Sequence, residues 1–300
     1  MPVARRYTSP VHAGARFVAQ RMLLKPLVWQ LLRVTVSGRE NLKGFKGAAV
    51  VVSNHSSHLD TPLIMGALPR RLGTSVATGA ASDYFFQVRW RKPLTTLFFN
   101  AFPIDRSGTR GRNGLTTNLL DNGVPILLYP EGGRSKTGAM STFKSGTAAL
   151  CISRGVPVLP FALVGAYEAM PKGKFWPRPG RPPVHVVIGK PMDPEPGETP
   201  RAFSRRIHQA VRALYDEHAI RLGLPNMDER DREIAADRTA QLEAHAGSDQ
   251  DDPVPFAAQD ASTNGTDEDS LGVQTDNALT DTVDADHDGS RQPGQDEDAP

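Results

Sequence analysis

Short runs of apolar residues alternate with amphipathic stretches along most of the chain after about residue 35. Six of these runs have the length and composition of buried strands, at residues 47–54, 73–78, 101–106, 124–130, 156–165 and 184–189. Helical patterns lie between or after them, at 61–68, 110–122, 141–154 and 199–222. Strands that alternate with helices are typical of a parallel sheet covered by helices. The pattern therefore predicts an α/β fold with a mostly parallel central sheet flanked by helices.

The N-terminal segment has a different pattern, in which apolar residues share one face of a helix over 12–35. Spacings of 7, 4 and 3 residues separate Phe17, Leu24, Val28 and Leu31. A kink is expected at Pro26. Such a segment either lies in a membrane interface with its basic residues near anionic headgroups or covers the sheet. Interrupted by Lys25 and Pro26, it has neither the pattern of a signal peptide nor the roughly 20 apolar residues of a membrane span.

Charged residues are distributed unevenly and divide the chain near residue 247. Of the 33 acidic and 35 basic residues, 15 acidic residues and one basic residue lie at 247–300, so 18 acidic and 34 basic residues remain in 1–246. The acidic stretch has few residues to bury and is predicted to be disordered. The remainder carries a formal charge of about +16. This charge suggests an anionic partner, such as a phosphorylated ligand, a membrane surface or a nucleic acid.

These patterns together predict four parts of the chain. They are an amphipathic, membrane-associating helical segment at 1–36, an α/β domain at 37–225, a candidate helical extension at 226–246 and a disordered acidic tail at 247–300. The lone cysteine, Cys151, lies in the apolar run AALCI and is expected to be a core thiol. A single cysteine cannot form a disulfide framework, which indicates a reducing compartment.

The first strand run ends in the polar sequence NHSSHLD, residues 54–60. Asn, Ser and Asp are common turn and helix-cap residues, so the sequence has an ordinary structural interpretation. A chemical interpretation also exists, because one tight turn separates His55 from Asp60 at the carboxyl edge of the sheet, where such sheets bind ligands. Histidine accepts a proton from an alcohol near neutral pH when another group fixes its tautomer. By itself, a His–Asp pair at this spacing is a weak signal.

Three more polar or proline-containing clusters lie at strand ends. In FPIDRSG, 102–108, Arg106 follows a strand directly. In YPEGGRS, 129–135, a glycine-rich turn brings backbone N–H groups and Arg134 within reach of an anion. In VPVLP, 156–160, two prolines indicate an edge or bulged strand beside a cavity. Each cluster alone is equally explained as a surface pair, a tight connection or a strand end.

Together and in this order, the four stretches resemble the motif blocks of the lysophospholipid acyltransferase family, which includes bacterial 1-acyl-glycerol-3-phosphate acyltransferase. The resemblance covers about residues 35–190 and makes 37–225 an acyltransferase domain. It implies transfer of a fatty acyl group from acyl-CoA or acyl-carrier protein to a lysophospholipid acceptor, 1-acyl-sn-glycerol-3-phosphate, forming phosphatidic acid. It also implies that no cofactor is needed beyond the acyl donor, and that the protein is attached to the membrane surface at the cytoplasmic face.

The resemblance also implies roles for individual residues. His55 would be the general base of the reaction, and Asp60 would orient it. The acceptor's phosphate or headgroup would be held by Arg106, Glu131, Gly132, Gly133 and Arg134. His58 matches no role in the family and is expected to be a turn residue.

Two departures from the family pattern concern the acceptor. Gly133 stands where family members usually carry Thr, and the stretch GAASDYFF, 79–86, lacks a lysine that phosphate-acceptor enzymes often have there. Both departures leave the acyl-transfer chemistry intact. An alternative is therefore an enzyme of the same family that acts on another lysolipid, a glycolipid or an aminolipid.

Two alternatives belong to other classes of protein. A metal hydrolase that used His55, His58 and Asp60 would need further ligands, but no second cluster at metal-ligand spacing follows in the folded part, so no metal site is predicted. A nonenzymatic lipid- or nucleic-acid-binding module would fit the basic charge. No nucleic-acid motif or aromatic stacking platform is found, so no nucleic-acid partner is expected. Such a module would not need the His–Asp pair.

Overall fold

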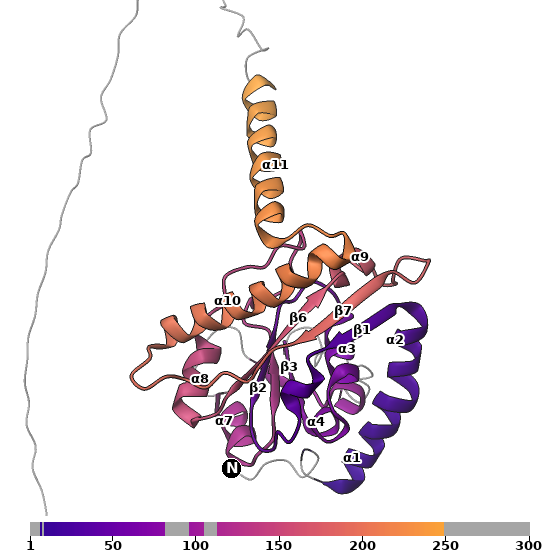
Figure 1. Ribbon diagram of the computed structural model, residues 1–300, viewed down its shortest axis with the longest axis vertical. Helices are drawn as coiled ribbons and strands as arrows, with labels where there is room; N and C mark the ends of the chain where they lie inside the picture. Colours follow the sequence, from indigo (N-terminus) through magenta and orange to yellow (C-terminus); the bar gives the residue numbers. More distant parts are fainter. Residues whose placement is uncertain (1–6, 8, 82–95, 105–112, 249–300) are drawn as a thin grey trace, which may run out of the picture. The chain divides into compact units, whose positions relative to one another are not determined.

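The computed structural model describes residues 7, 9–81, 96–104 and 113–248 (Figure 1). Within these residues a seven-stranded sheet has the strand order β1-β7-β6-β2-β5-β3-β4. All neighbouring strands are parallel except β6 and β7. The strands are β1 (Arg33–Ser37), β2 (Val50–Ser53), β3 (Ala77–Ala81), β4 (Phe102–Ile104), β5 (Ile126–Leu128), β6 (Val158–Val164) and β7 (Pro183–Ile188). The predicted α/β fold with a mostly parallel sheet is confirmed.

Helices cover both faces of this sheet. The helices of the described chain are α1 (Pro10–Phe17), α2 (Lys25–Leu31), α3 (Asp60–Ala67), α4 (Arg70–Ser75), α7 (Asn113–Asp121), α8 (Gly146–Arg154), α9 (Ala166–Ala169), α10 (Pro200–Ala219) and α11 (Met227–Ser248), the last of which extends away from the sheet (Figure 1). A π-helical segment, Val18–Leu24, joins α1 to α2, and short 3₁₀ helices occupy Arg39–Leu42 and Ile220–Leu222. In the part of the chain that the structure describes, none of these helices combines the length and apolarity needed to cross a bilayer.

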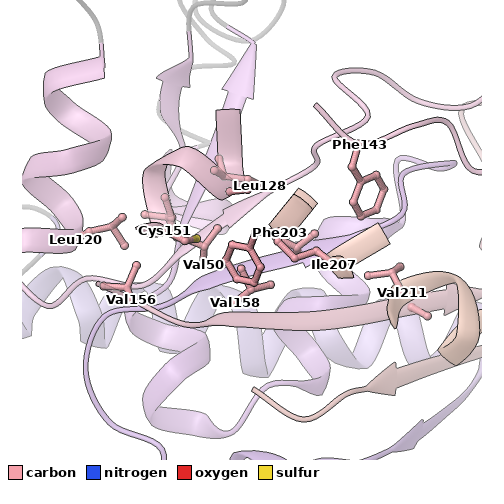
Figure 2. Packing of buried hydrophobic residues seen from close by; sticks show 14 of the residues in the cluster. Val50, Leu120, Leu128, Phe143, Cys151, Val156, Val158, Phe203, Ile207 and Val211 are labelled. Carbon is pink, nitrogen blue, oxygen red and sulfur yellow. The ribbon is translucent and has the colours of Figure 1, made fainter. Parts of the chain in front are cut away.

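Two hydrophobic layers fill the spaces between sheet and helices. Successive strand residues point to opposite faces, so Val50 packs on the side of α7, α8 and α10, whereas Val51 packs on the side of α2, α3 and α4. Figure 2 shows Phe203 and Ile207 of α10 in the first layer. Cys151 is fully buried in the same layer, and its burial raises the pKa of the thiol to about 12. The predicted core thiol is confirmed.

The N-terminal helical stretch ends earlier than the predicted 12–35. It ends at Leu31, and Arg33–Ser37 forms the edge strand β1, which pairs in parallel with β7. A division at residue 36 would therefore cut a strand of the sheet. The sequence RVTVS alternates polar residues with valine, which is the signal of a half-buried strand.

The π-helical segment lies directly before the predicted kink at Pro26. There the N–H of Lys25 donates to the carbonyl of Gln20, five residues earlier. In a regular α-helix the ring of Pro26 would clash with the carbonyl four residues before it. The wider π turn accommodates the proline without ending the helix, and Figure 1 shows one continuous run from α1 to α2.

The sequence predicts that VPVLP is an edge or bulged strand, and the edge position is wrong. Strand β6 lies inside the sheet, between β7 and β2. Proline has no backbone N–H to donate to a neighbouring strand. Pro160 is tolerated there because β7 ends at Ile188, so no residue of β7 lies opposite Pro160. Its carbonyl accepts from the N–H of Gly189, and a Cβ at Gly189 would lie 2.8 Å from the proline ring. A glycine beside the proline thus permits the close approach.

The C-terminal part of the described chain is the predicted helical extension. Helix α11 covers Met227–Ser248, and its first residue, Met227, is completely buried. Arg230 is also buried and contacts Glu168 of α9 and Tyr215 of α10. These contacts attach the start of α11 to the α/β domain. The predicted acidic tail lies outside the described residues from position 249 on.

Candidate active site

The loop between β2 and α3 carries the His–Asp pair and is fixed at its start by Asn54. The side-chain amide of Asn54 donates to the carbonyl of Leu163, and its oxygen accepts from the N–H of the same residue, at 3.0 and 2.8 Å. These two bonds continue the pairing of β2 with β6 one position beyond Ser53. The turn therefore begins at a defined point on the carboxyl edge of the sheet, and His55 follows at once.

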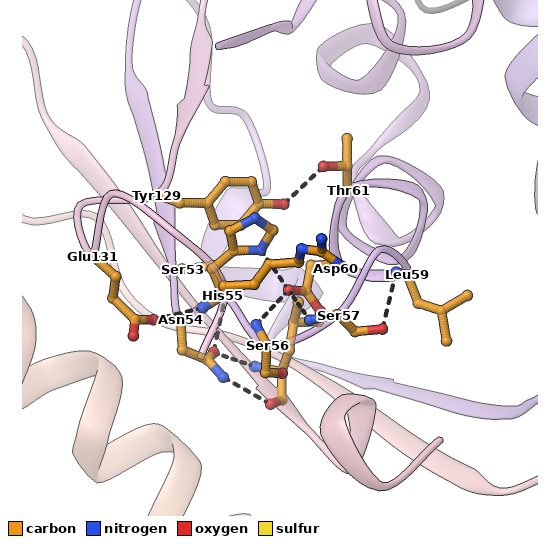
Figure 3. Close-up of polar contacts among 12 residues, drawn as sticks. Ser53, Asn54, His55, Ser56, Ser57, Leu59, Asp60, Thr61, Tyr129 and Glu131 are labelled. Atoms are coloured by element: carbon orange, nitrogen blue, oxygen red, sulfur yellow. Dashed lines mark hydrogen bonds and ion pairs between the residues drawn. The ribbon is translucent and has the colours of Figure 1, made fainter. Parts of the chain in front are cut away.

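His55 and Asp60 meet side chain to side chain (Figure 3). The distance between His55 Nδ1 and Asp60 Oδ2 is 2.7 Å, and Asp60 is completely buried whereas the His55 side chain is 21% exposed. The N–H groups of Ser56 and Ser57 also donate to Oδ2, at 2.8 and 2.9 Å. Asp60 is the first residue of α3, where the helix dipole stabilises a negative charge. A neutral imidazole whose Nδ1–H donates to this carboxylate keeps its lone pair on Nε2.

Tyr129 lies flat against the imidazole. The two ring centroids are 3.9 Å apart with an angle of 13° between the planes, and the phenol is 3.0 Å from the hydroxyl of Thr61. Burial and then the charge of Asp60 raise the pKa of Tyr129 well above its ordinary value, so the phenol stays protonated. Sequence reasoning missed this contact. The sequence places Tyr129 at the end of a predicted strand, but only the structure shows that this strand, β5, lies next to β2.

Glu131 holds the backbone of His55. Its Oε1 accepts from the N–H of His55 at 2.6 Å, and its Oε2 accepts from the N–H of Ser141 at 2.8 Å. The carbonyl of His55 accepts in turn from the N–H of Ser135 at 2.8 Å. Both carboxylate oxygens are therefore engaged, and a carboxylate repels phosphate. This geometry favours a positioning role for Glu131 over the predicted contact with the acceptor.

Positive charge surrounds the other residues of the glycine-rich turn. Nη1 of Arg134 is buried without a hydrogen-bond partner among the described residues. Lys172 approaches the same turn through its Nζ, 3.4 Å from the carbonyl of Arg134. Gly132 has a φ of 78°, and a Cβ there would lie 2.8 Å from Nζ of Lys144. Sequence reasoning missed Lys144 and Lys172, because both come close only through the fold.

The remaining predicted residues have different outcomes. His58 lies in a turn, as expected, and burial followed by the charge of Arg134 lowers its pKa, so it is neutral near pH 7. Gly133 has open space where a side chain would be. Arg106 lies outside the described residues, as does most of the stretch that lacks the expected lysine. Across the described ranges no three His, Cys, Asp or Glu side chains gather as metal ligands would.

We expect Glu131→Gln to destabilise the protein by about 1–3 kcal/mol, because a carboxamide offers only one acceptor and one backbone N–H would lose its partner. Burial raises the pKa of Glu131 from 4.5 to about 7. Between these values the folded protein binds more protons than the unfolded chain, so wild-type stability decreases as pH rises. The advantage of wild type over the variant should therefore be larger at the acidic end of this window than above it.

Chemical denaturation at both ends of this pH window measures the difference. Glu40→Gln is the matched control, because Glu40 is exposed in a 3₁₀ helix and should leave the pH dependence unchanged. Equal pH dependence in wild type and Glu131→Gln would contradict the assignment of the titration to Glu131.

The segment that carries this site is similar in sequence to known proteins. The acyltransferase family model matches residues 33–164. A 1-acyl-sn-glycerol-3-phosphate acyltransferase from Pseudomonas aeruginosa is 30% identical over 231 residues, covering 69% of this chain and 79% of that protein. One from Chlamydomonas reinhardtii is 32% identical over 164 residues, covering 54% of this chain and 47% of that protein. The chain thus spans about half the length of the algal relative.

A solved structure shares the fold. The crystal structure of the 1-acyl-sn-glycerophosphate acyltransferase PlsC from Thermotoga maritima has a TM-score of 0.55 and 26% sequence identity, covering 66% of this chain and 78% of that one. The residues that the family model matches include the loop that carries His55 and Asp60 and the turn that carries Glu131 and Arg134. By its sequence and its fold, the chain belongs to the acyltransferase family that includes the 1-acyl-sn-glycerol-3-phosphate acyltransferases.

Proposed function

We propose that the protein transfers a fatty acyl group from acyl-CoA or acyl-carrier protein to the free hydroxyl of 1-acyl-sn-glycerol-3-phosphate and so forms phosphatidic acid for phospholipid synthesis. The observation that carries this proposal is the pair of His55 with the buried Asp60, inside the segment matched by the family model. The names of the relatives support the same acceptor.

The proposed reaction is direct transfer to the acceptor. The acceptor hydroxyl gives its proton to Nε2 of His55 while its oxygen attacks the thioester carbonyl. Asp60 stabilises the imidazolium that forms. Collapse of the tetrahedral intermediate breaks the carbon–sulfur bond, and the thiolate takes the proton from His55 to leave as a free thiol. Cys151 is an unsuitable nucleophile for an acyl-enzyme, because it is buried and burial raises its pKa to about 12.

We assign the acceptor's phosphate to the cationic side of the glycine-rich turn. Arg134 supports this assignment, because its buried Nη1 has no partner in the described part of the protein and an unpaired buried donor is costly. Lys144 and Lys172 add positive charge beside it. Arg106 is proposed to complete the site on the strength of the family resemblance. The reaction needs no group beyond its two substrates.

We further propose that the protein attaches to the cytoplasmic face of the cell membrane through its N-terminal helical segment. Large apolar side chains of this segment are half exposed or more, namely Val18, Met22, Leu23 and Leu27. Its polar residues Arg16 and Gln20 are instead buried and donate to the carbonyls of Thr74 and Phe98. A helix with polar residues inward and apolar residues outward suits a membrane interface. From the predicted apolar face, Leu24, Val28 and Leu31 pack on the core that covers the sheet.

A second exposed apolar group supports this attachment. Phe175 and Trp176 are 86% and 66% exposed in a loop that is rich in Lys and Arg. Arg181 of the same loop donates to the carbonyl of Trp29 in α2 at 3.1 Å, so the loop meets the end of the N-terminal helical segment. Aromatic rings among positive charges are typical of residues at headgroup level.

Thiol release from acyl-CoA tests the acyl-transfer proposal. We expect purified protein to release thiol when lysophosphatidate is present and to release little without an acceptor. Other lysophospholipids and a glycolipid serve as alternative acceptors in parallel reactions. Thiol release that depends on one of these instead would identify a different physiological acceptor, and the acyl-transfer reaction would be unchanged.

A variant at Gly133 sharpens the comparison of acceptors. Because the space beside Gly133 is open, Gly133→Thr should fit without displacing a neighbour and restores the hydroxyl usual in the family. Gly133→Val is the matched control, since it adds the same volume without a hydroxyl. A lower KM for lysophosphatidate in the Thr variant alone would support a contact between the side chain at position 133 and the acceptor's phosphate.

A further inference from the structure

Two basic side chains flanked by two aromatic ones form a stripe along the N-terminal helical segment. The stripe consists of Phe17, Arg21, Lys25 and Trp29, at a constant spacing of four residues. In a regular α-helix this spacing drifts by about 40° at each step, but the wider π turn of Val18–Leu24 offsets the drift. Together with Pro26 and Arg70 of α4, the stripe lines a wide, open groove of about 460 Å³. We call this the cationic groove.

Two glycines of the neighbouring helices make room for the stripe. A Cβ at Gly66 of α3 would lie 2.5 Å from the ring of Trp29, and one at Gly73 of α4 would lie 2.9 Å from Nη2 of Arg21. Arg21 also donates to the carbonyls of Gly66 and Leu68, at 3.1 and 2.5 Å, and so closes the C-terminal end of α3. The groove is therefore a packed structural feature rather than a chance gap between surface side chains.

Among the described residues, the positive charges of the cationic groove have no acidic ion-pair partner. The ion pairs between described residues include none of Arg21, Lys25 and Arg70. Lys25 instead lies over the ring of Trp29 at 5.0 Å, and Arg70 lies over that of Phe17 at 4.1 Å. Burial, followed by repulsion from neighbouring arginines, lowers the pKa of both Arg21 and Lys25. An anion in the groove would relieve this repulsion.

The groove is separate from the proposed acyl-transfer site. It lies at the C-terminal end of α3, whereas Asp60 is the first residue of that helix, and a helix of eight residues is about 12 Å long. Exposed Met22 and Leu23 stand on the same helical segment beside Arg21. The ligand that fits is therefore an anion attached to an apolar body.

We propose that the cationic groove binds the phosphate headgroup of an anionic phospholipid in the membrane surface, and that this lipid is not the acyl acceptor. The inference rests on the proposed membrane attachment but not on the proposed acyl transfer. Lys25 and Arg70 hold the phosphate, Phe17 and Trp29 flank it, and the exposed apolar residues of the segment contact the acyl chains.

Vesicle binding by the full chain tests this inference. We expect wild type to prefer vesicles that contain phosphatidylglycerol over vesicles of phosphatidylcholine alone. In the double variant Lys25→Gln/Arg70→Gln, affinity for the anionic vesicles should fall about 30-fold, since each basic residue contributes about 1 kcal/mol at such a surface. Lys25→Arg/Arg70→Lys keeps both charges and should retain most of the affinity. Unfolding midpoints equal to that of wild type would show that the variants are folded.

Two controls distinguish binding in the groove from a general attraction between a basic protein and an anionic vesicle. Arg201→Gln/Arg205→Gln removes two exposed arginines of α10, and an equal loss of affinity in this variant would overturn the proposal. Displacement of wild type from vesicles by glycerol phosphate would overturn it too, because the groove would then be a site for free phosphate. Binding is measured equally well in His55→Ala, so a failure of the acyl-transfer proposal is distinguishable from a failure here.

Discussion

Replacement of His55 by alanine is expected to reduce acyl turnover by about 10²–10⁴-fold, the range that general-base assistance supplies. The acceptor hydroxyl would lose the group that accepts its proton, whereas Asp60 would keep the N–H groups of Ser56 and Ser57 and Tyr129 would keep its contact with Thr61. Because the imidazole is 21% exposed, its removal should leave the protein folded. Acceptor-dependent thiol release measures the effect, with an unfolding midpoint for each variant.

His58→Ala is the matched control for this experiment. His58 belongs to the same loop and lies in a turn, and it takes no part in the proposed transfer. We expect this variant to keep most of its turnover. Retention of more than about a tenth of the wild-type rate by His55→Ala, well above the range expected for a lost general base, would remove His55 from the mechanism.

Asp60→Asn is expected to lower turnover by about 10²-fold or more, although it preserves the shape of the loop. The carboxamide oxygen can still accept from the N–H groups of Ser56 and Ser57, which bind Oδ2 in the wild type. It carries no charge to stabilise the imidazolium of His55, however, and its NH₂ group would be buried where Oδ1 now has no partner. The loss should therefore appear in kcat rather than in KM.

Steady-state kinetics over a range of acceptor concentrations separates the two constants. Asp121→Asn is the control, because Asp121 is exposed and pairs with Arg154 on the surface. A variant at Asp60 with unchanged kcat and a raised KM would show that the loop binds the acceptor rather than orienting the base.

The sequence predicts the fold well where the pattern of apolar residues is local. Most strands of the central sheet appear as short apolar runs, and their alternation with helices predicts an α/β fold. The strand predicted at 73–78 is misplaced, because its first half belongs to helix α4 and β3 begins only at Ala77. Strand β1 is missed because apolar residues at helical spacing continue through Leu31, and no glycine or proline lies between Leu31 and Arg33 to mark the end of the helix. The place of β6 inside the sheet is also missed, because strand order depends on contacts between distant segments that no local pattern records.

In the candidate site, too, contacts between nearby residues can be predicted and contacts between distant segments cannot. His55 and Asp60 are five positions apart, so a turn alone brings them together and their pairing can be predicted. Glu131 reaches the backbone of His55 across 76 positions, and this contact exists only because β5 lies next to β2. The resemblance to the family marked the residue, but its role as a support for the loop required the structure.

The buried position of Cys151 has a practical consequence for measurement. It is the only cysteine in the chain, it is fully buried, and burial raises its pKa to about 12, so it should be unreactive in the folded protein. A thiol-reactive dye would then report only coenzyme released by the reaction. A cysteine introduced at the exposed Met22 or Trp176 could likewise be labelled selectively in the otherwise unaltered protein, and the emission of a polarity-sensitive probe there would report how deeply each position enters the lipid.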